Sequence, residues 1–321
     1  MPPARRGRGR RRHGAPDAVG HEGSVRTVRI SHEQAGTEPG RVATAAPGGA
    51  AGTAAGGRTG RATADGDRSA AGRESYRDVV RRLASAQKAA APGAPAYSIL
   101  VNRPLGRLLA AWAYRRGLTP DAVTGISAAF TFTGIALVAL VGPGLLTAVL
   151  VPLALVVGYA FDSADGQVAR LRGGGSVAGE WLDHVVDSIK ISTLHLAVLV
   201  MAYRFLDLPS EAWLLVPVGF TAVGAVSFFA MILNEQLKRG VAARTGVPTP
   251  PPAPVPLLRR LLVLPTDYGI LCLAFVLLAI PQAFFWAYTL LFAGSAGHLV
   301  LALLKWRRDM VRLAQTVTSG A

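Results

Sequence analysis

Apolar residues dominate the chain from about residue 97 onward, in long runs that polar residues interrupt at intervals. A helix needs about 20 apolar residues to cross roughly 30 Å of hydrocarbon. Runs near that length predict six transmembrane helices, at residues 121–141, 144–169, 179–203, 211–234, 266–281 and 282–304. The last two are separated only by Ile280-Pro281-Gln282, so their boundary is the least sharply marked. The predicted fold class is an all-α integral membrane protein, with a six-helix transmembrane catalytic domain over 119–308.

The segment 97–117, just before the first span, has a different pattern. Large apolar residues recur there at helical spacing, namely Leu105, Leu108, Leu109 and Trp112. Arginines occupy the other faces, at Arg103, Arg107, Arg115 and Arg116. We expect an amphipathic juxtamembrane helix that lies in the headgroup plane. The alternative is a soluble helix packed on another domain, but the sequence shows no soluble domain to receive it.

Composition separates the N-terminal segment from the rest of the chain. The 321 residues are 51% hydrophobic, only 17% are charged, and the net charge is +15, which is typical of a basic membrane protein. The first 90 residues hold 17 Lys and Arg against 8 Asp and Glu, with few large apolar residues. Residues 1–95 are therefore expected to be a disordered basic cytoplasmic tail that touches anionic lipid. Aromatic residues are almost absent before Tyr76, so no nucleic-acid partner is expected.

Charge in the loops predicts the orientation of the spans. The loop Gly142-Pro143-Gly144 carries no charge, whereas Arg170 and Arg172 lie between the second and third spans. Basic residues again follow the fourth and sixth spans. This alternation predicts a multi-pass protein of the plasma membrane with both termini in the cytoplasm, and residues 309–321 as a C-terminal tail. The single cysteine, Cys272, excludes a disulfide framework within the chain.

Four carboxylates and an arginine lie at fixed intervals where the second and third spans face each other. The pattern is D-x₂-D-G-x₂-A-R-x₈-G-x₃-D-x₃-D, formed by Asp162, Asp165, Gly166, Ala169, Arg170, Gly179, Asp183 and Asp187. Within each pair the aspartates are three or four residues apart, so each pair shares one helix face. A single aspartate at the end of a span is often only a helix cap, but eight fixed positions are not explained in that way. Ionisable groups at a membrane edge are costly unless an ion or substrate compensates them.

The residue types indicate a metal site for phosphate chemistry. Carboxylates without His or Cys partners favour hard cations such as Mg²⁺ or Mn²⁺ over zinc. Gly166 and Ala169 leave a bare helix surface beside them, and Arg170 offers a planar fork for phosphate oxygens. Carboxylates, divalent ions and an arginine together are typical of phosphoryl transfer.

The motif resembles, at every position, the signature of the CDP-alcohol phosphatidyltransferase family, and the likeness extends over about 97–308. The resemblance implies a homodimeric membrane enzyme that joins the phosphate of a CDP-linked donor to an alcohol and releases CMP. It implies two divalent ions held by Asp162, Asp165 and Asp183, with Asp187 contacting a metal and acting as general base. The resemblance further implies that a subset of the motif binds nucleotide or phosphate, namely Asp162, Gly166, Ala169, Arg170 and Gly179.

The acceptor and two alternative functions stay open at this point. CDP-diacylglycerol is the expected donor. His184, which follows Asp183, also resembles the aminoalcohol branch, which transfers a phosphoaminoalcohol group from CDP to diacylglycerol. A phosphorylated acceptor would need further cations, for which Lys190, Arg103 and Arg107 are candidates, although Lys190 equally fits a snorkelling lysine at the membrane edge. A carboxylate-based ion-coupled transporter would place such groups near the midplane in repeated halves, which the sequence lacks. A catalytically silent scaffold would not need the complete motif.

Overall fold

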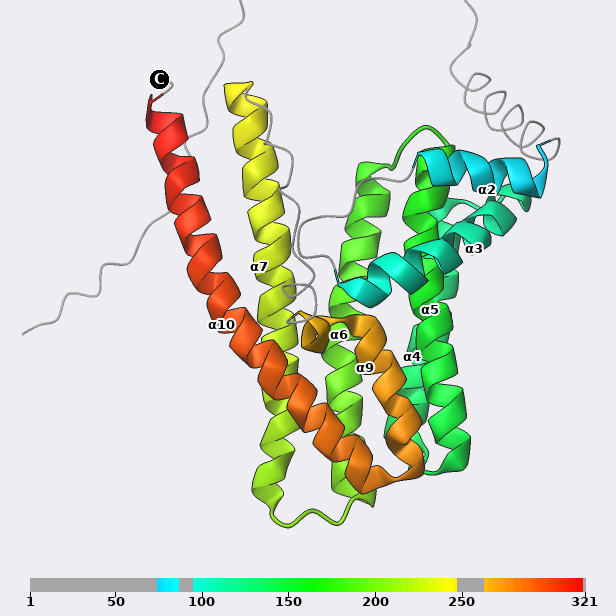
Figure 1. The fold of residues 1–321 in the computed structure, drawn as a ribbon, viewed down its shortest axis with the longest axis vertical. Coiled ribbons are helices and arrows are strands. Elements are labelled where there is room, and N and C mark those ends of the chain that lie inside the picture. The colour runs from blue at the N-terminus through cyan, green and yellow to red at the C-terminus, as the bar shows by residue number, and fades with distance from the viewer. Residues whose placement is uncertain (1–73, 87–94, 247–262, 320–321) are drawn as a thin grey trace, which may run out of the picture. The chain divides into compact units, whose positions relative to one another are not determined.

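The structure is a computed structural model that describes residues 74–86, 95–246 and 263–319; of 316–319 only the backbone is described. These residues all belong to one compact unit and form helices without any strand. Figure 1 shows long helices running side by side, with two shorter helices, α2 and α3, lying across one end of the bundle. The expected connector at 248–256 and the tail before residue 74 lie outside the described residues.

Five helices are long and apolar enough to cross a membrane. They are α4 (Pro120–Leu140), α5 (Leu145–Leu171), α6 (Val177–Phe205), α7 (Leu215–Thr245) and α10 (Pro281–Ser319). The prediction of an all-α membrane-embedded protein is confirmed at this level. At a rise of about 1.5 Å per residue, Asp162 lies roughly 26 Å along α5 from Leu145, close to the edge of a hydrocarbon layer about 30 Å thick.

The segment expected as the fifth span differs from the prediction. It forms only α9 (Tyr268–Ala274) followed by a 3₁₀ turn (Phe275–Ala279), a stretch of about 20 Å that is shorter than the hydrocarbon layer. Prolines bracket it, since Pro265 lies in the preceding turn and Pro281 is the first residue of α10. Proline disfavours the helical conformation of the residue before it, so Pro281 marks the end of this stretch and limits the length of its helix.

A helix also forms inside the segment that was predicted to be a disordered tail. This is α2 (Tyr76–Ser85), and the prediction was wrong for these residues. Val79 and Leu83, four residues apart, are buried against α3 (Arg103–Arg115), which follows a π-helical turn at Ser98–Asn102. Two apolar residues are too few to change the average composition of residues 1–95. Composition alone therefore did not predict this helix.

The C-terminal end of the chain was also predicted wrongly. Residues 309–319 continue α10 instead of forming a separate tail. In the last described turns, Lys305 Nζ lies 2.7 Å from Asp309 Oδ2, an ion pair of the (i, i+4) type that supports an exposed helix. Figure 1 shows this end of α10 extending beside α7 beyond the other helices.

Small residues let the helices around the acidic motif approach closely. At Gly158 on α5 a Cβ atom would collide with the Thr131 side chain of α4, and it would lie 3.1 Å from the Ser127 carbonyl oxygen. At Gly106 on α3 a Cβ atom would lie 2.7 Å from Ser163 Oγ on α5. The helix α5 is therefore held between α4 and the juxtamembrane helix α3, and this packing fixes the turn that carries Asp162.

Candidate metal and phosphate site

Three of the four motif aspartates converge between α5 and α6. One carboxylate oxygen from each of Asp162, Asp165 and Asp183 lies within 4.8 Å of the other two, a spacing that fits ligands of a shared cation. Asp165 is buried, whereas Asp162 and Asp183 are half-buried, so the group opens toward solvent on one side. Three carboxylates without a nitrogen or sulfur ligand make a hard donor set, which suits Mg²⁺ or Mn²⁺.

The fourth aspartate, Asp187, lies one turn further along α6 and is held by a lysine. Lys190 Nζ donates to Asp187 Oδ1 at 3.2 Å, to Asp162 Oδ1 at 2.5 Å and to Ser127 Oγ at 3.1 Å. An ammonium group has three N–H donors, so these contacts use them all. Lys190 is 5% exposed and does not extend to the membrane surface, so the snorkelling alternative does not describe it.

Two hydroxyl groups from α4 complete this arrangement. Thr124 Oγ1 donates to Asp165 Oδ2 at 2.8 Å, and Ser127 Oγ lies 3.5 Å from Asp162 Oδ1. The backbone N–H of Gly166 also donates to Asp165 Oδ1. Hydrogen bonds of this kind orient carboxylate ligands before an ion arrives. Sequence reasoning missed Thr124 and Ser127. Their three-residue spacing on one face of a largely apolar span was the available signal.

The small residues of the motif leave a free surface next to the carboxylates. Gly166 is exposed, and a Cβ atom placed there would meet only Arg170 Nη1, at 3.7 Å, which is ordinary contact. Ala169 is half-buried and Arg170 is exposed on the same stretch of α5. Protein packing therefore does not require glycine at position 166, in contrast to Gly158. The open face beside an exposed guanidinium matches the expected place for a phosphate-bearing group.

The last glycine of the motif lies at the start of α6, away from the open face. Its N–H donates to Ser176 Oγ at 2.9 Å, in the N-cap of the helix. A Cβ atom at Gly179 would lie 3.2 Å from Asp121 Oδ1 of α4, tighter than ordinary contact. A larger residue here would require the Asp121 and Ser176 side chains to shift by a few tenths of an ångström, so the local packing favours a small residue. The predicted role of Gly179 in nucleotide binding stays a prediction.

His184 faces α7 rather than the group of aspartates. Its Nε2 lies 3.8 Å from Glu180 Oε1, and its ring meets the Phe228 ring edge-to-face at 6.3 Å. Glu180 in turn accepts from Arg239 Nη1 at 2.6 Å, which ties α6 to α7. The structure thus gives His184 a packing role beside the site. The resemblance to the aminoalcohol branch stays a prediction.

Asp267, at the start of α9, acts as a helix cap. Its two carboxylate oxygens accept from the backbone N–H groups of Gly269 at 3.0 Å and of Tyr97 at 2.9 Å. Burial raises the pKa of Asp267 above its ordinary value, and the backbone donors partly oppose this shift. The residue joins the start of α9 to the chain just before α3, and it does not belong to the group of three aspartates.

A family model for CDP-alcohol phosphatidyltransferases matches residues 117–304. The crystal structure of Mycobacterium tuberculosis phosphatidylinositol phosphate synthase with manganese and citrate is 24% identical, covers 62% of this chain and 87% of that one, and has a TM-score of 0.39. The same enzyme with CDP-DAG bound is 22% identical, covers 64% and 93%, and has a TM-score of 0.38. No curated protein matches the sequence. The family model covers more than half of the chain and the whole acidic motif.

Proposed function

The chain belongs to the CDP-alcohol phosphatidyltransferase family, and on this basis we propose that it moves a phosphatidyl group from CDP-diacylglycerol to an alcohol and releases CMP. The observation that supports this most directly is the convergence of Asp162, Asp165 and Asp183 within 4.8 Å, beside an open helix face. A CDP-linked lipid has both a diphosphate and acyl chains. A hard-cation site near the edge of a membrane helix bundle suits both parts of such a donor.

Asp162, Asp165 and Asp183 would hold the divalent ions, of which the family resemblance implies two. Bound Mg²⁺ or Mn²⁺ would offset the charge of the donor diphosphate and of the departing CMP. Thr124 and Gly166 keep Asp165 in one orientation, so little ordering of this ligand is needed when an ion binds.

The open face of α5 would orient the donor. The surface at Gly166 and Ala169 admits a flat group close to the helix backbone, and Arg170 presents a charged fork to phosphate oxygens. Contacts of this type hold the phosphorus in line with the attacking oxygen, and positioning supplies much of the rate enhancement in phosphoryl transfer.

Asp187 would accept the proton of the acceptor alcohol. As the alcohol oxygen forms its bond to phosphorus, its proton passes to Asp187, and the bond between that phosphorus and the CMP oxygen breaks. Lys190 donates to one oxygen of Asp187 and so orients the other. Its three donors are already used inside the site, which argues against Lys190 as the cation that a phosphorylated acceptor would need. Cytoplasmic placement of the site and a homodimeric state stay predictions from the charge pattern and the resemblance.

The test is CMP release by the purified full chain in detergent, with CDP-diacylglycerol, Mg²⁺ or Mn²⁺ and a panel of alcohols. Asp187→Asn should lower turnover by at least about 100-fold, the scale of a lost general base, while Mn²⁺ binding measured by electron paramagnetic resonance changes little. Asp183→Asn should weaken Mn²⁺ binding itself. Asp309→Asn, which removes a carboxylate far along α10, serves as the matched control. It should change neither turnover nor Mn²⁺ binding.

The two readouts separate the possible failures. Absence of CMP with every acceptor, from a preparation that still binds Mn²⁺, would argue against the transferase. Unchanged turnover in Asp187→Asn would remove this residue as the base but leave the reaction in place. The acceptor that supports CMP release identifies the alcohol.

A further inference from the structure

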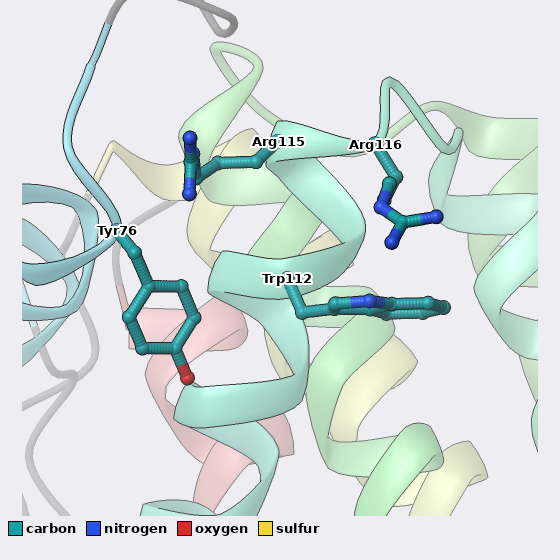
Figure 2. Close-up of a pocket in the computed structure, with 4 residues that line it drawn as sticks. All are labelled: Tyr76, Trp112, Arg115 and Arg116. Carbon is teal, nitrogen blue, oxygen red and sulfur yellow. The ribbon is translucent and has the colours of Figure 1, made fainter.

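A cavity of about 280 Å³ lies between α2 and α3, separate from the acidic site. Tyr76 of α2 forms one wall, and Trp112, Arg115 and Arg116 at the C-terminal end of α3 form the others. Figure 2 shows Arg116 over the indole ring of Trp112, and Arg115 on the side of the cavity that faces Tyr76. The volume is just below the range of cavities that enclose whole drug-sized molecules, so it suits a single headgroup.

Both aromatic walls are anchored by the fold. The Tyr76 hydroxyl donates to the backbone carbonyl of Leu108 at 3.1 Å. The Trp112 ring meets Phe161 of α5 edge-to-face, with centroids 6.2 Å apart and planes at 70°. These contacts hold the walls in place without a ligand, and preformed walls reduce the entropy that binding costs.

The cavity is strongly positive. Its lining contains two exposed guanidinium groups and no carboxylate, and within the described part of the chain no ion pair is formed by Arg115 or Arg116. The guanidinium carbon of Arg116 lies 5.7 Å from the centre of the Trp112 ring, a cation–π contact that leaves its N–H groups available. The nearby acidic residues Asp78 and Glu74 are paired instead with other arginines of α2.

The surroundings of the cavity match a membrane surface. Leu105, Leu108 and Trp112 lie on one face of α3 and expose 39%, 45% and 38% of their surface. The arginines of the cavity follow this apolar face at the end of the helix, so apolar and cationic groups adjoin there. A helix of this kind lies between headgroups and acyl chains.

We propose that this cavity binds the phosphate of an anionic phospholipid headgroup. Arg115 and Arg116 contact the phosphate oxygens, Trp112 and Tyr76 enclose the headgroup, and the acyl chains extend along the apolar face of α3. A lipid is favoured over a soluble phosphate compound because the exposed apolar face continues from the cavity. The proposal concerns binding alone and does not depend on the reaction assigned to the acidic site.

The experiment measures lipid binding to the purified full chain in detergent by native mass spectrometry, with phosphatidylglycerol and with zwitterionic phosphatidylcholine. The runs include EDTA so that no metal-dependent binding at the acidic site contributes. Replacing both arginines, as Arg115→Gln with Arg116→Gln, should lower the affinity for phosphatidylglycerol by at least about tenfold. Trp112→Leu, which removes the cation–π platform, should lower it by about two- to fivefold. Binding of phosphatidylcholine should be unchanged in both the double arginine variant and Trp112→Leu.

The matched control removes two exposed arginines of α10, as Arg307→Gln with Arg308→Gln. It should leave phosphatidylglycerol binding within about twofold of the unmodified chain. An equal loss in both double variants would show a general charge effect and overturn the proposal, as would no loss in the cavity variant. Competition by soluble glycerol phosphate at concentrations similar to those of the lipid would assign the cavity to a free phosphate compound instead. Size-exclusion profiles of all variants confirm that each remains folded.

Discussion

Replacing Lys190 by methionine tests the electrostatic arrangement of the acidic site most directly. Methionine keeps an unbranched side chain of similar length but removes the ammonium group and all three of its hydrogen bonds. Asp162 and Asp187 then face each other's charge without the cation that lies between them. We expect the variant to be less stable than the unmodified chain when no metal is bound, and to recover more of its stability when Mg²⁺ is added.

The size of the effect follows from the burial of the three groups. The Lys190 side chain is 6% exposed, while Asp162 and Asp187 are 22% and 27% exposed. Breaking a buried ion pair by removing one partner costs about 3–5 kcal/mol. Both carboxylates keep some contact with solvent, so we take the lower end, about 3 kcal/mol. For domains of 150–250 residues this corresponds to a fall in Tm of about 6–12 °C.

The assay is thermal unfolding in detergent, followed by intrinsic fluorescence, in excess EDTA and then in saturating Mg²⁺. Lys305→Met is the matched control, because it removes an ion pair with Asp309 in which the side chains are 57% and 26% exposed. An exposed pair contributes about 0–1 kcal/mol, so this control should lose no more than about 4 °C. The reasoning is refuted if Lys190→Met in EDTA loses no more than the control, or if Mg²⁺ raises the Tm of both forms equally.

Three further substitutions test what α4 and α5 contribute to the site and to its packing. Thr124→Val removes the hydroxyl that orients Asp165 and should weaken Mn²⁺ binding by about 10-fold, read from a Mn²⁺ titration, with little change in Tm. Gly166→Ala should fold normally, because a Cβ atom has room there, but it should raise KM for the CDP-linked donor in the CMP-release assay. Gly158→Ala should show the opposite behaviour, a loss of thermal stability, because its Cβ atom collides with Thr131.

The motif aspartates were predictable from the sequence because helical spacing determines which residues share a face. Asp162 and Asp165 are three residues apart, and a short loop between the two spans returns Asp183 toward them. Both relations are local in the chain, so no knowledge of the remaining bundle was needed to bring these three together. The contact between Asp187 and Lys190 was harder to predict, because Lys190 also forms hydrogen bonds with residues of α4 and α5.

Long-range packing explains what the sequence did not predict. Thr124 becomes part of the site only because α4 crosses α5 at Gly158, and this crossing depends on contacts between residues far apart in the chain. The helix α2 forms for a similar reason, since its two buried residues, Val79 and Leu83, are covered only when α3 is beside them. Short helices draw most of their stability from such packing, and a count of residue types over a long window does not register it.

The helix α3 connects the acidic site to the cavity lined by Trp112. On α3, Gly106 packs on Ser163 and Trp112 packs on Phe161, and these two residues flank Asp162 on α5. A larger side chain at position 106 would push α3 away from the turn that carries this aspartate. The position of α3 and the position of Asp162 are therefore set by the same contacts. This is a physical reason why the helix α3 accompanies the acidic site on α5.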